Sequence, residues 1–282
     1  METINGLRTN VKHFDSPEAY ADWLESIPAN LRANYDQSFG GAYLEKGVSI
    51  LRAGNLDRLE DAKRIMDQLD VEGLISNSMP ILQSSIAGMI PNIPNAIAGH
   101  PETMFSRGHI ESPNLTTPLN VYVETTVSAG VSQKELINRG VAILAFALAM
   151  ETIRPVELYI ALPHSHSRKP GVYCPVIKIA SRPMDLGRAV WMLTDPCFAR
   201  RLFHTAINHL SECGMQCQVG PWAWNSDPTR EQYETNFRKL LDMQPEDVLL
   251  KGGYLTDKLM LTNPVQWVKN MIEKHRGDVS VN

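Results

Sequence analysis

The segment that decides the fold is LNVYVETTVSAGVSQKELINRGVAILAFALAMETIRPVELYIAL, residues 119–162. It opens with an apolar, β-branched run, Leu119–Thr125, and closes with a second one, Val156–Leu162. Such runs are typical of buried strands. Between them, Ser132 and Glu135 have the spacing of a capping box, which marks the start of a helix. The pattern therefore predicts a strand, a helix and a second strand, in that order.

The helix of this segment is predicted over Leu136–Met150 and is apolar on nearly all of its surface. A helix of this kind is pressed against a sheet on one side and covered by other elements on the outside. The pair Arg154-Pro155 stops it, because proline cannot continue a helix. Two strands of one sheet that are joined by a helix run parallel with a right-handed crossover. We therefore expect a βαβ unit at the centre of an α/β fold.

Composition and charge describe an ordinary soluble chain. The 282 residues are 43% hydrophobic and 21% charged, which suffices for one large domain or for a domain with an extension. The net charge of −4 argues against broad electrostatic binding to nucleic acid or to an anionic membrane. The chain has four cysteines, no secretory signal and no apolar run of transmembrane length. These features predict a reducing, intracellular setting.

Outside the central segment, the pattern divides the chain into three parts. Residues 1–70 are predicted as an N-terminal helical extension, with a flexible start over Met1–Lys12. Residues 71–118 are rich in Ser, Pro, Asn and Gly, and such a segment is either a functional loop or a covering arm. Residues 119–282 are predicted as the α/β core. Within that core we expect a third strand over Cys174–Ala180 and a short strand over residues 247–250.

Residues 164–171, HSHSRKPG, follow the second strand of the βαβ unit directly. His164 and His166 alternate in extended chain, so both rings would lie on one side, where they could hold a metal or a phosphate. The alternative is a polar loop with a basic tip, formed by Arg168 and Lys169, and no third metal ligand lies nearby in the sequence. We interpret these four residues as a candidate binding surface.

The order of the elements, together with the end of the first strand, resembles a von Willebrand factor A-like domain. Such domains carry D-x-S-x-S at that point, where oxygen atoms bind a divalent cation. Glu124, Thr126 and Ser128 stand at the three positions, with glutamate in place of aspartate. The resemblance implies a Rossmann-like, mostly parallel sheet flanked by helices. It also implies Mg²⁺ or another divalent cation, with Asp185 as a candidate further ligand, or a degenerate, metal-free form of the site.

A second resemblance covers more of the chain. It is carried by FGGAYLEKGVSILRAGN, AIAGHPETM, the central segment, PMDLGRAVWMLTDPCFARRLF and DVLLKGG. Together these stretches are similar to an uncharacterised domain family of tailed phages and prophages. The resemblance implies a phage protein that is present in the host cytoplasm.

Two classes of function follow from these observations. The first is a non-enzymatic protein-interaction or assembly protein, in which the region from Glu124 to Ser128 and the residues 164–169 contact a phage or host protein. The alternative is a metal-dependent hydrolase or nuclease that acts on phosphate esters, or else a nucleic-acid-binding protein. The sequence has no Walker loop, no Gly-rich dinucleotide motif, no nucleophile elbow and no H-E-x-x-H. We therefore favour the interaction class.

Overall fold

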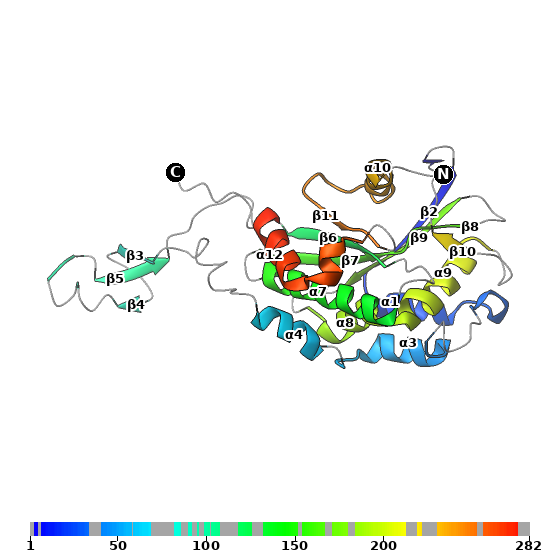
Figure 1. Cartoon of the computed structure of the whole chain (residues 1–282), viewed down its shortest axis with the longest axis horizontal. Helices are drawn as coiled ribbons and strands as arrows, with labels where there is room; N and C mark the ends of the chain where they lie inside the picture. Colours follow the sequence, from blue (N-terminus) through cyan, green and yellow to red (C-terminus); the bar gives the residue numbers. More distant parts are fainter. Residues whose placement is uncertain are drawn as a thin grey trace.

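A mixed sheet lies at the centre of the described part of the chain (Figure 1). In this computed structural model the strand order is β1-β2-β9-β7-β6-β11, and β8 and β10 extend the sheet beside β9. The strands are β1 (Thr3–Ile4), β2 (Leu7–Phe14), β6 (Leu119–Glu124), β7 (Val156–Ala161), β8 (His164–His166), β9 (Val172–Ile179), β10 (Val219–Pro221) and β11 (Val248–Leu250). The structure describes residues 3–4, 7–33, 41–57, 59–68, 82–85, 90–91, 95, 99–101, 103–107, 118–125, 132–151, 154–166, 171–179, 184–212, 219–221, 230–252 and 256–275.

The predicted βαβ unit is confirmed. Strands β6 and β7 are parallel, and α7 (Gln133–Glu151) connects them. The capping box forms as expected, since the Ser132 N–H donates to Glu135 Oε2 at 2.9 Å and the Glu135 N–H donates to Ser132 Oγ at 3.2 Å. The Ser132 hydroxyl, which also donates to Glu135 Oε2 at 2.7 Å, and the Ser132 N–H lower the pKa of Glu135, because both hydrogen bonds favour the ionised carboxylate. The sequence of this unit thus specifies its own helix start.

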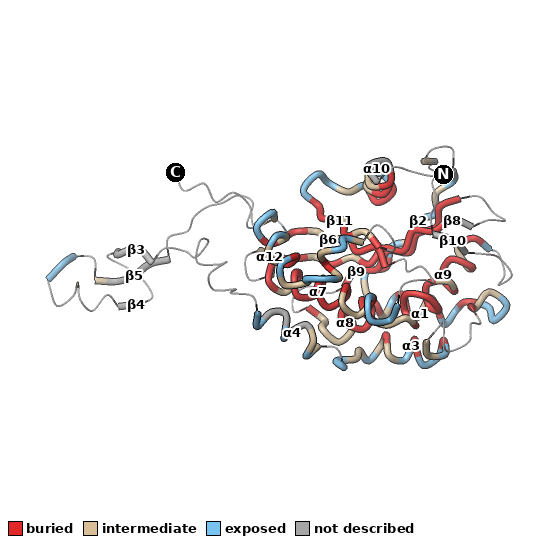
Figure 2. Tube along the Cα trace, viewed as in Figure 1, coloured by how far each residue is buried: buried red, intermediate tan, exposed pale blue. Residues whose placement is uncertain are grey.

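Helices cover the two faces of the sheet unequally (Figures 1 and 2). On one face, α7 and its neighbours bury Val121, Val123, Leu158 and Ile160. On the other face, α10 (Arg230–Leu240) packs over the sheet through a smaller apolar cluster. The helices of the first face are α1 (Pro17–Glu25), α3 (Leu44–Ala53), α4 (Leu59–Asp67), α8 (Leu186–Thr194), α9 (Phe203–Leu210), α11 (Lys258–Thr262) and α12 (Pro264–His275).

Close packing of α7 on α8 depends on Gly140. A Cβ atom at this position would lie 2.4 Å from the Leu193 carbonyl oxygen, so no larger residue fits without a shift of backbone. The contact joins the first half of α7 to the end of α8, so a larger residue would push the two helices apart.

Residues 3–4 and 7–14 belong to the sheet. Strand β2 runs parallel to β9 from Thr9, opposite Val172, to Phe14, opposite Ile177. The expectation of a flexible start over Met1–Lys12 was wrong for residues 7–12. Apolar alternation is weak there because few of its side chains are large and apolar, so the strand has no clear period of two in the sequence.

The predicted third strand is confirmed as β9, but it runs antiparallel to β7, with Leu158 opposite Ile179 and Ala161 opposite Val176. Because β8 also pairs antiparallel with β9, the chain turns back on itself after His166. Three of the four neighbouring pairs among β2, β9, β7, β6 and β11 are nevertheless parallel. The fold is therefore α/β, with a mostly parallel mixed sheet flanked by helices.

The expected irregular region, residues 71–118, is described only in pieces. Three short strands in it form a separate antiparallel sheet in the order β3-β5-β4. They are β3 (Leu82–Ser85), β4 (Ile90–Pro91) and β5 (Met104–Arg107). Among all the helices of the described ranges, none has both the length and the apolar character needed to cross a membrane.

Candidate functional site

Glu124 ends strand β6 and is almost completely buried, with 5% of its surface exposed. Its carboxylate Oε2 accepts a hydrogen bond of 2.9 Å from the N–H of Gly252, just beyond the end of β11. Strands β6 and β11 are parallel neighbours, so this hydrogen bond joins their carboxyl ends. The residue that the sequence suggests as a metal ligand therefore has a partner within the protein.

Arg139 lies beneath the same strand ends and is 4% exposed. Its Nη2 donates to the carbonyl oxygens of Glu124 at 2.6 Å, Leu250 at 3.3 Å and Lys251 at 3.1 Å. Burial lowers the pKa of Arg139 to about 10, and the negative charge of Glu124 opposes that shift. The guanidinium is therefore still protonated at neutral pH, and it holds the ends of both strands.

The position of Arg139 follows from local helix geometry. It lies in the second turn of α7, and long helical side chains point back toward the helix N-terminus. The N-terminus of α7 is the end nearer to the carboxyl end of β6, since the helix follows that strand. Among the described residues, Nε and Nη1 of Arg139 have no hydrogen-bond partner. The nearby carboxylate of Glu124 is thus the main compensation for a buried positive charge.

The residues described at this end of the sheet do not fit a divalent cation. Strand β9 ends beside the start of β7, whereas Glu124 lies beside the end of β7, so the chain leaves β9 toward Asp185 at the opposite end of the strands from Glu124. There the Asp185 carboxylate caps α8 by accepting from the Arg188 N–H at 3.1 Å, and it forms an ion pair with the Arg188 side chain. Thr126 and Ser128 lie outside the described residues. Within the described ranges, no group of three His, Cys, Asp or Glu side chains could hold a metal ion.

His164 is an interior residue, with 2% of its surface exposed, and not part of an exposed surface. Its ring packs edge-on against the ring of Phe203, with the two centroids 5.2 Å apart, and its centroid lies 6.0 Å from that of His204. Burial and the charge of Arg200 lower the pKa of His204 to about 4, so this neighbour is neutral at pH 7. The backbone of His166 pairs with Val219 in β10. The side chain of His166, as well as Arg168 and Lys169, lies outside what the structure describes.

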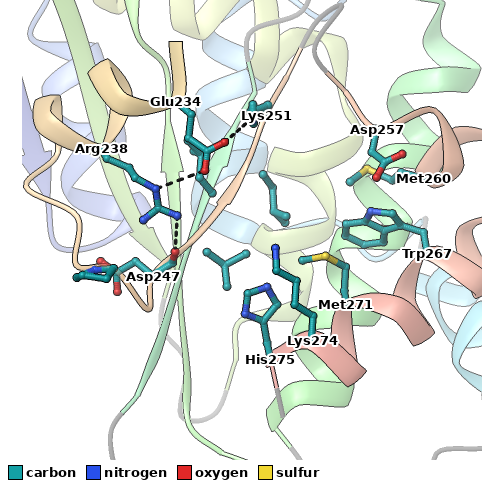
Figure 3. Close-up of a pocket in the computed structure, with 14 residues that line it drawn as sticks. Glu234, Arg238, Asp247, Lys251, Asp257, Met260, Trp267, Met271, Lys274 and His275 are labelled. Carbon is teal, nitrogen blue, oxygen red and sulfur yellow. Dashed lines mark hydrogen bonds and ion pairs between the residues drawn. The ribbon is translucent and has the colours of Figure 1, made fainter. Parts of the chain in front are cut away.

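A pocket of about 300 Å³ lies beside strand β11, and the sequence did not reveal it (Figure 3). Helix α10 provides one wall, and α11 and α12 provide the other. The residues that line the pocket are Glu234, Arg238, Pro245, Asp247, Val248, Leu249, Leu250, Lys251, Asp257, Met260, Trp267, Met271, Lys274 and His275. These come from four separate elements, so only the tertiary fold brings them together.

Buried apolar side chains and charged groups together line the pocket. Val248, Leu250, Met260 and Trp267 line it and are themselves buried. On the α10 side, the carboxylate of Glu234 accepts from Lys251 Nζ at 2.5 Å and from Arg238 Nε at 3.5 Å. A concave site that combines apolar side chains with polar groups is the usual form of a ligand site.

Strand β11 is the last strand in the order of the main sheet. Its inner edge pairs with β6, from Val248 opposite Val121 to Leu250 opposite Val123. Its outer edge has no strand partner in the described ranges, and the pocket lies alongside it. Unpaired backbone groups on an edge strand can accept an additional strand. The sequence DVLLKGG predicts the strand itself, but only the fold shows that it is an edge.

The face of the sheet near α10 is aromatic and acidic. Tyr122 and Tyr159 stack with ring centroids 4.8 Å apart and an interplanar angle of 13°. The hydroxyl of Tyr159 donates to Glu157 Oε2 at 2.6 Å, and Lys178 pairs with the same carboxylate at 2.8 Å. Partial burial, together with the nearby carboxylates of Asp247, Glu157 and Asp242, raises the pKa of Tyr122 to about 12. Carboxylates therefore lie close to both stacked rings.

The electrostatic interaction between the Glu124 carboxylate and the Arg139 guanidinium can be tested by a double-mutant cycle with Glu124→Gln and Arg139→Met. Each single change leaves one buried polar partner uncompensated, so each is expected to lower the free energy of unfolding by about 3 kcal/mol. The double variant should lose less than the sum, with a coupling of roughly 1–3 kcal/mol in urea denaturation. Additive losses, within about 0.5 kcal/mol, would show that the two side chains do not interact.

The comparisons with known proteins give a family but no activity. No curated protein and no solved structure matches the chain. A family model described as a domain of unknown function, DUF7192, matches residues 2–231, from the first strands to the start of α10. The match covers more than half of the chain and includes Glu124 and Arg139. The chain therefore belongs to the DUF7192 family.

Proposed function

We propose that the chain is a non-enzymatic protein-interaction or assembly protein that binds an extended segment of a partner along strand β11. The observation that carries this proposal is the outer edge of β11, which has no strand partner among the described residues and has beside it a pocket lined by buried apolar side chains and charged groups. In this mode of recognition, main-chain hydrogen bonds provide affinity, and a pocket for alternate side chains provides specificity. The pocket of about 300 Å³ is at the small end of ligand sites, which suits one or two side chains of a longer partner.

Strand β11 is fixed before any partner arrives. Gly252 is held by Glu124, and the carbonyl groups of Leu250 and Lys251 are held by Arg139. Near the start of the strand, the Asp247 carboxylate accepts from Asn120 Nδ2 at 2.9 Å. Because both ends of β11 are tied to the rest of the core, a partner strand would not have to order it. Such preorganisation lowers the entropic cost of binding.

We further propose that the fold is a von Willebrand factor A-like domain in a degenerate, metal-free form. The α/β core and the position of Glu124 at the end of a parallel strand support this assignment. The positive charge beside Glu124 comes from the Arg139 guanidinium, which removes the need for a divalent cation there. The similarity of several segments to a tailed-phage domain family supports a phage or host protein as the partner, in the host cytoplasm.

The other classes of function have less support. The Glu124 carboxylate is buried and bound to a backbone N–H group, so it is poorly placed to act on a phosphate ester. The stacked pair Tyr122 and Tyr159 could offer a platform for bases, but the carboxylates of Glu157 and Asp247 next to it would repel a nucleic-acid backbone. A protein partner agrees better with this charge distribution.

The metal-free form predicts no effect of divalent cations on stability. Mg²⁺ or Mn²⁺ in the millimolar range, added to chain treated with a chelator, should leave the melting temperature unchanged, because a ligand that does not bind the folded state cannot stabilise it. Differential scanning fluorimetry with and without each ion measures this effect. A rise in melting temperature that Ser128→Ala removes would instead establish an ion site and contradict the metal-free form.

If an extended partner segment binds along β11, a charge introduced inside the pocket should block its binding. Extended peptides selected from a random library on the full chain should bind Met271→Glu at least about tenfold more weakly, since a charged carboxylate would replace an apolar side chain in the pocket wall. The measurement is isothermal titration calorimetry with the selected peptides. Gln266→Glu is the matched control, because it introduces the same charge at an exposed position of α12 that does not line the pocket and is two turns away from Lys274.

Selected peptides should bind the Gln266→Glu control as they bind the wild type. If the peptides bind Met271→Glu without loss, their site is elsewhere and the assignment to β11 fails. Turnover of a phosphodiester that is lost in Glu124→Ala would contradict the interaction class as a whole.

A further inference from the structure

The acidic and basic side chains around the β11 pocket differ in whether they have partners within the described part of the chain. All three acidic side chains have partners within the chain. Glu234 is paired with Lys251 and Arg238, and Asp247 accepts from Asn120 and from the Gln244 N–H. The third, Asp257, accepts from the Leu259 N–H at 2.9 Å. Glu234 is thus neutralised within the chain, and Asp247 and Asp257 each accept from a backbone N–H group.

The basic groups on the α12 wall differ from the acids. Lys274 lines the pocket, is exposed, and has no ion-pair or hydrogen-bond partner among the described residues. Next to it, His275 has a buried Nε2 that lacks a hydrogen-bond partner in the same part of the chain. Figure 3 shows both side chains on the α12 wall, beside Met271 and opposite Glu234 and Arg238. One cation and one buried imidazole nitrogen therefore remain available to a ligand.

We propose that the partner segment presents a carboxylate to Lys274 and His275 while an adjacent apolar side chain enters the pocket. The inference rests on the proposed binding along β11 and adds the chemistry of the partner. Burial and the charges of Lys274 and Arg154 lower the pKa of His275 to about 4, so its ring is neutral at pH 7 and can donate one N–H. A carboxylate accepts from both groups, and hydrogen bonds to charged groups are the stronger kind.

A carboxylate fits these groups better than a phosphate does. Phosphate is best recognised by the two-pronged fork of an arginine. Arg238 cannot provide that fork, because its Nε donates to Glu234, its Nη1 to the Gln244 carbonyl at 3.0 Å and its Nη2 to the Asp247 carbonyl at 3.0 Å. Three carboxylates also line the pocket, and they would repel a dianion more strongly than a monoanion.

The apolar component of the partner follows from the floor of the pocket. Trp267 and Met260 are buried beneath it, and Met271 lies between them and Lys274 along α12 (Figure 3). Met side chains adapt to apolar groups of different shapes. A segment that places an aliphatic or aromatic residue beside its carboxylate would therefore contact both parts of the site.

The test is a selection on the full chain from a library of random, N-acetylated pentapeptides. Each sequence is present as the free C-terminal acid, as the neutral amide, and as an amide that contains one aspartate. Peptides with a carboxylate, whether at the free C-terminus or on the aspartate side chain, should be enriched by the wild type about tenfold over neutral peptides. Lys274→Gln should remove this preference, and Lys269→Gln, on the same helix but outside the pocket wall, should keep it.

The outcomes separate this inference from the function on which it rests. The wild type could retain neutral and carboxylate-bearing peptides equally, while Met271→Glu still loses binding. That result would contradict the proposal that the partner presents a carboxylate, but it would leave the proposed binding site along β11 in place. A preference for carboxylate-bearing peptides that persists in Lys274→Gln also contradicts the inference, because residues other than Lys274 would then bind the carboxylate. If no member of the library is retained, both proposals fail.

Discussion

The structure depends on one buried contact, in which Glu124 and Arg139 close the carboxyl ends of β6 and β11. Removing two charges from water costs several kcal/mol, and their mutual attraction offsets that cost only where hydrogen bonds complete the pair. Here one guanidinium nitrogen reaches three carbonyl oxygens, and the carboxylate holds a backbone N–H group from the neighbouring strand end. The contact therefore contributes less to net stability than to fixing where β11 ends.

That fixed position determines what the rest of the molecule can present. Most helices cover one face of the sheet, and α10 lies over the other (Figure 1). Strand β11 runs at the edge between α10 and α12, with the pocket beside it. The edge strand, the apolar floor formed by Trp267 and Met260, and the unoccupied Lys274 thus lie next to one another. We interpret this arrangement as a site for an extended protein segment.

Local signals in the sequence predicted the elements that depend on neighbouring residues. Strand-like runs and the Ser132 capping box predicted the βαβ unit, and the hydrogen bonds of that capping box form as expected. Properties that depend on distant contacts were not predicted. Glu124 looked like a metal ligand because its partner Gly252 is far away in the sequence, and Arg139 looked like one polar residue within an apolar helix. Likewise, the edge position of β11 and the antiparallel direction of β9 exist only in the assembled sheet.

The central claim is that the buried contact holds the edge strand in its binding position. Hydrogen exchange of the β11 amides that pair with β6, measured by NMR in the wild type and in Arg139→Met, tests it most directly. The account predicts that these amides exchange at least about tenfold faster in the variant, while amides in the middle of α7 and in β7 change much less, because the opening is local. Equal acceleration throughout the sheet, or none in β11, would contradict the account.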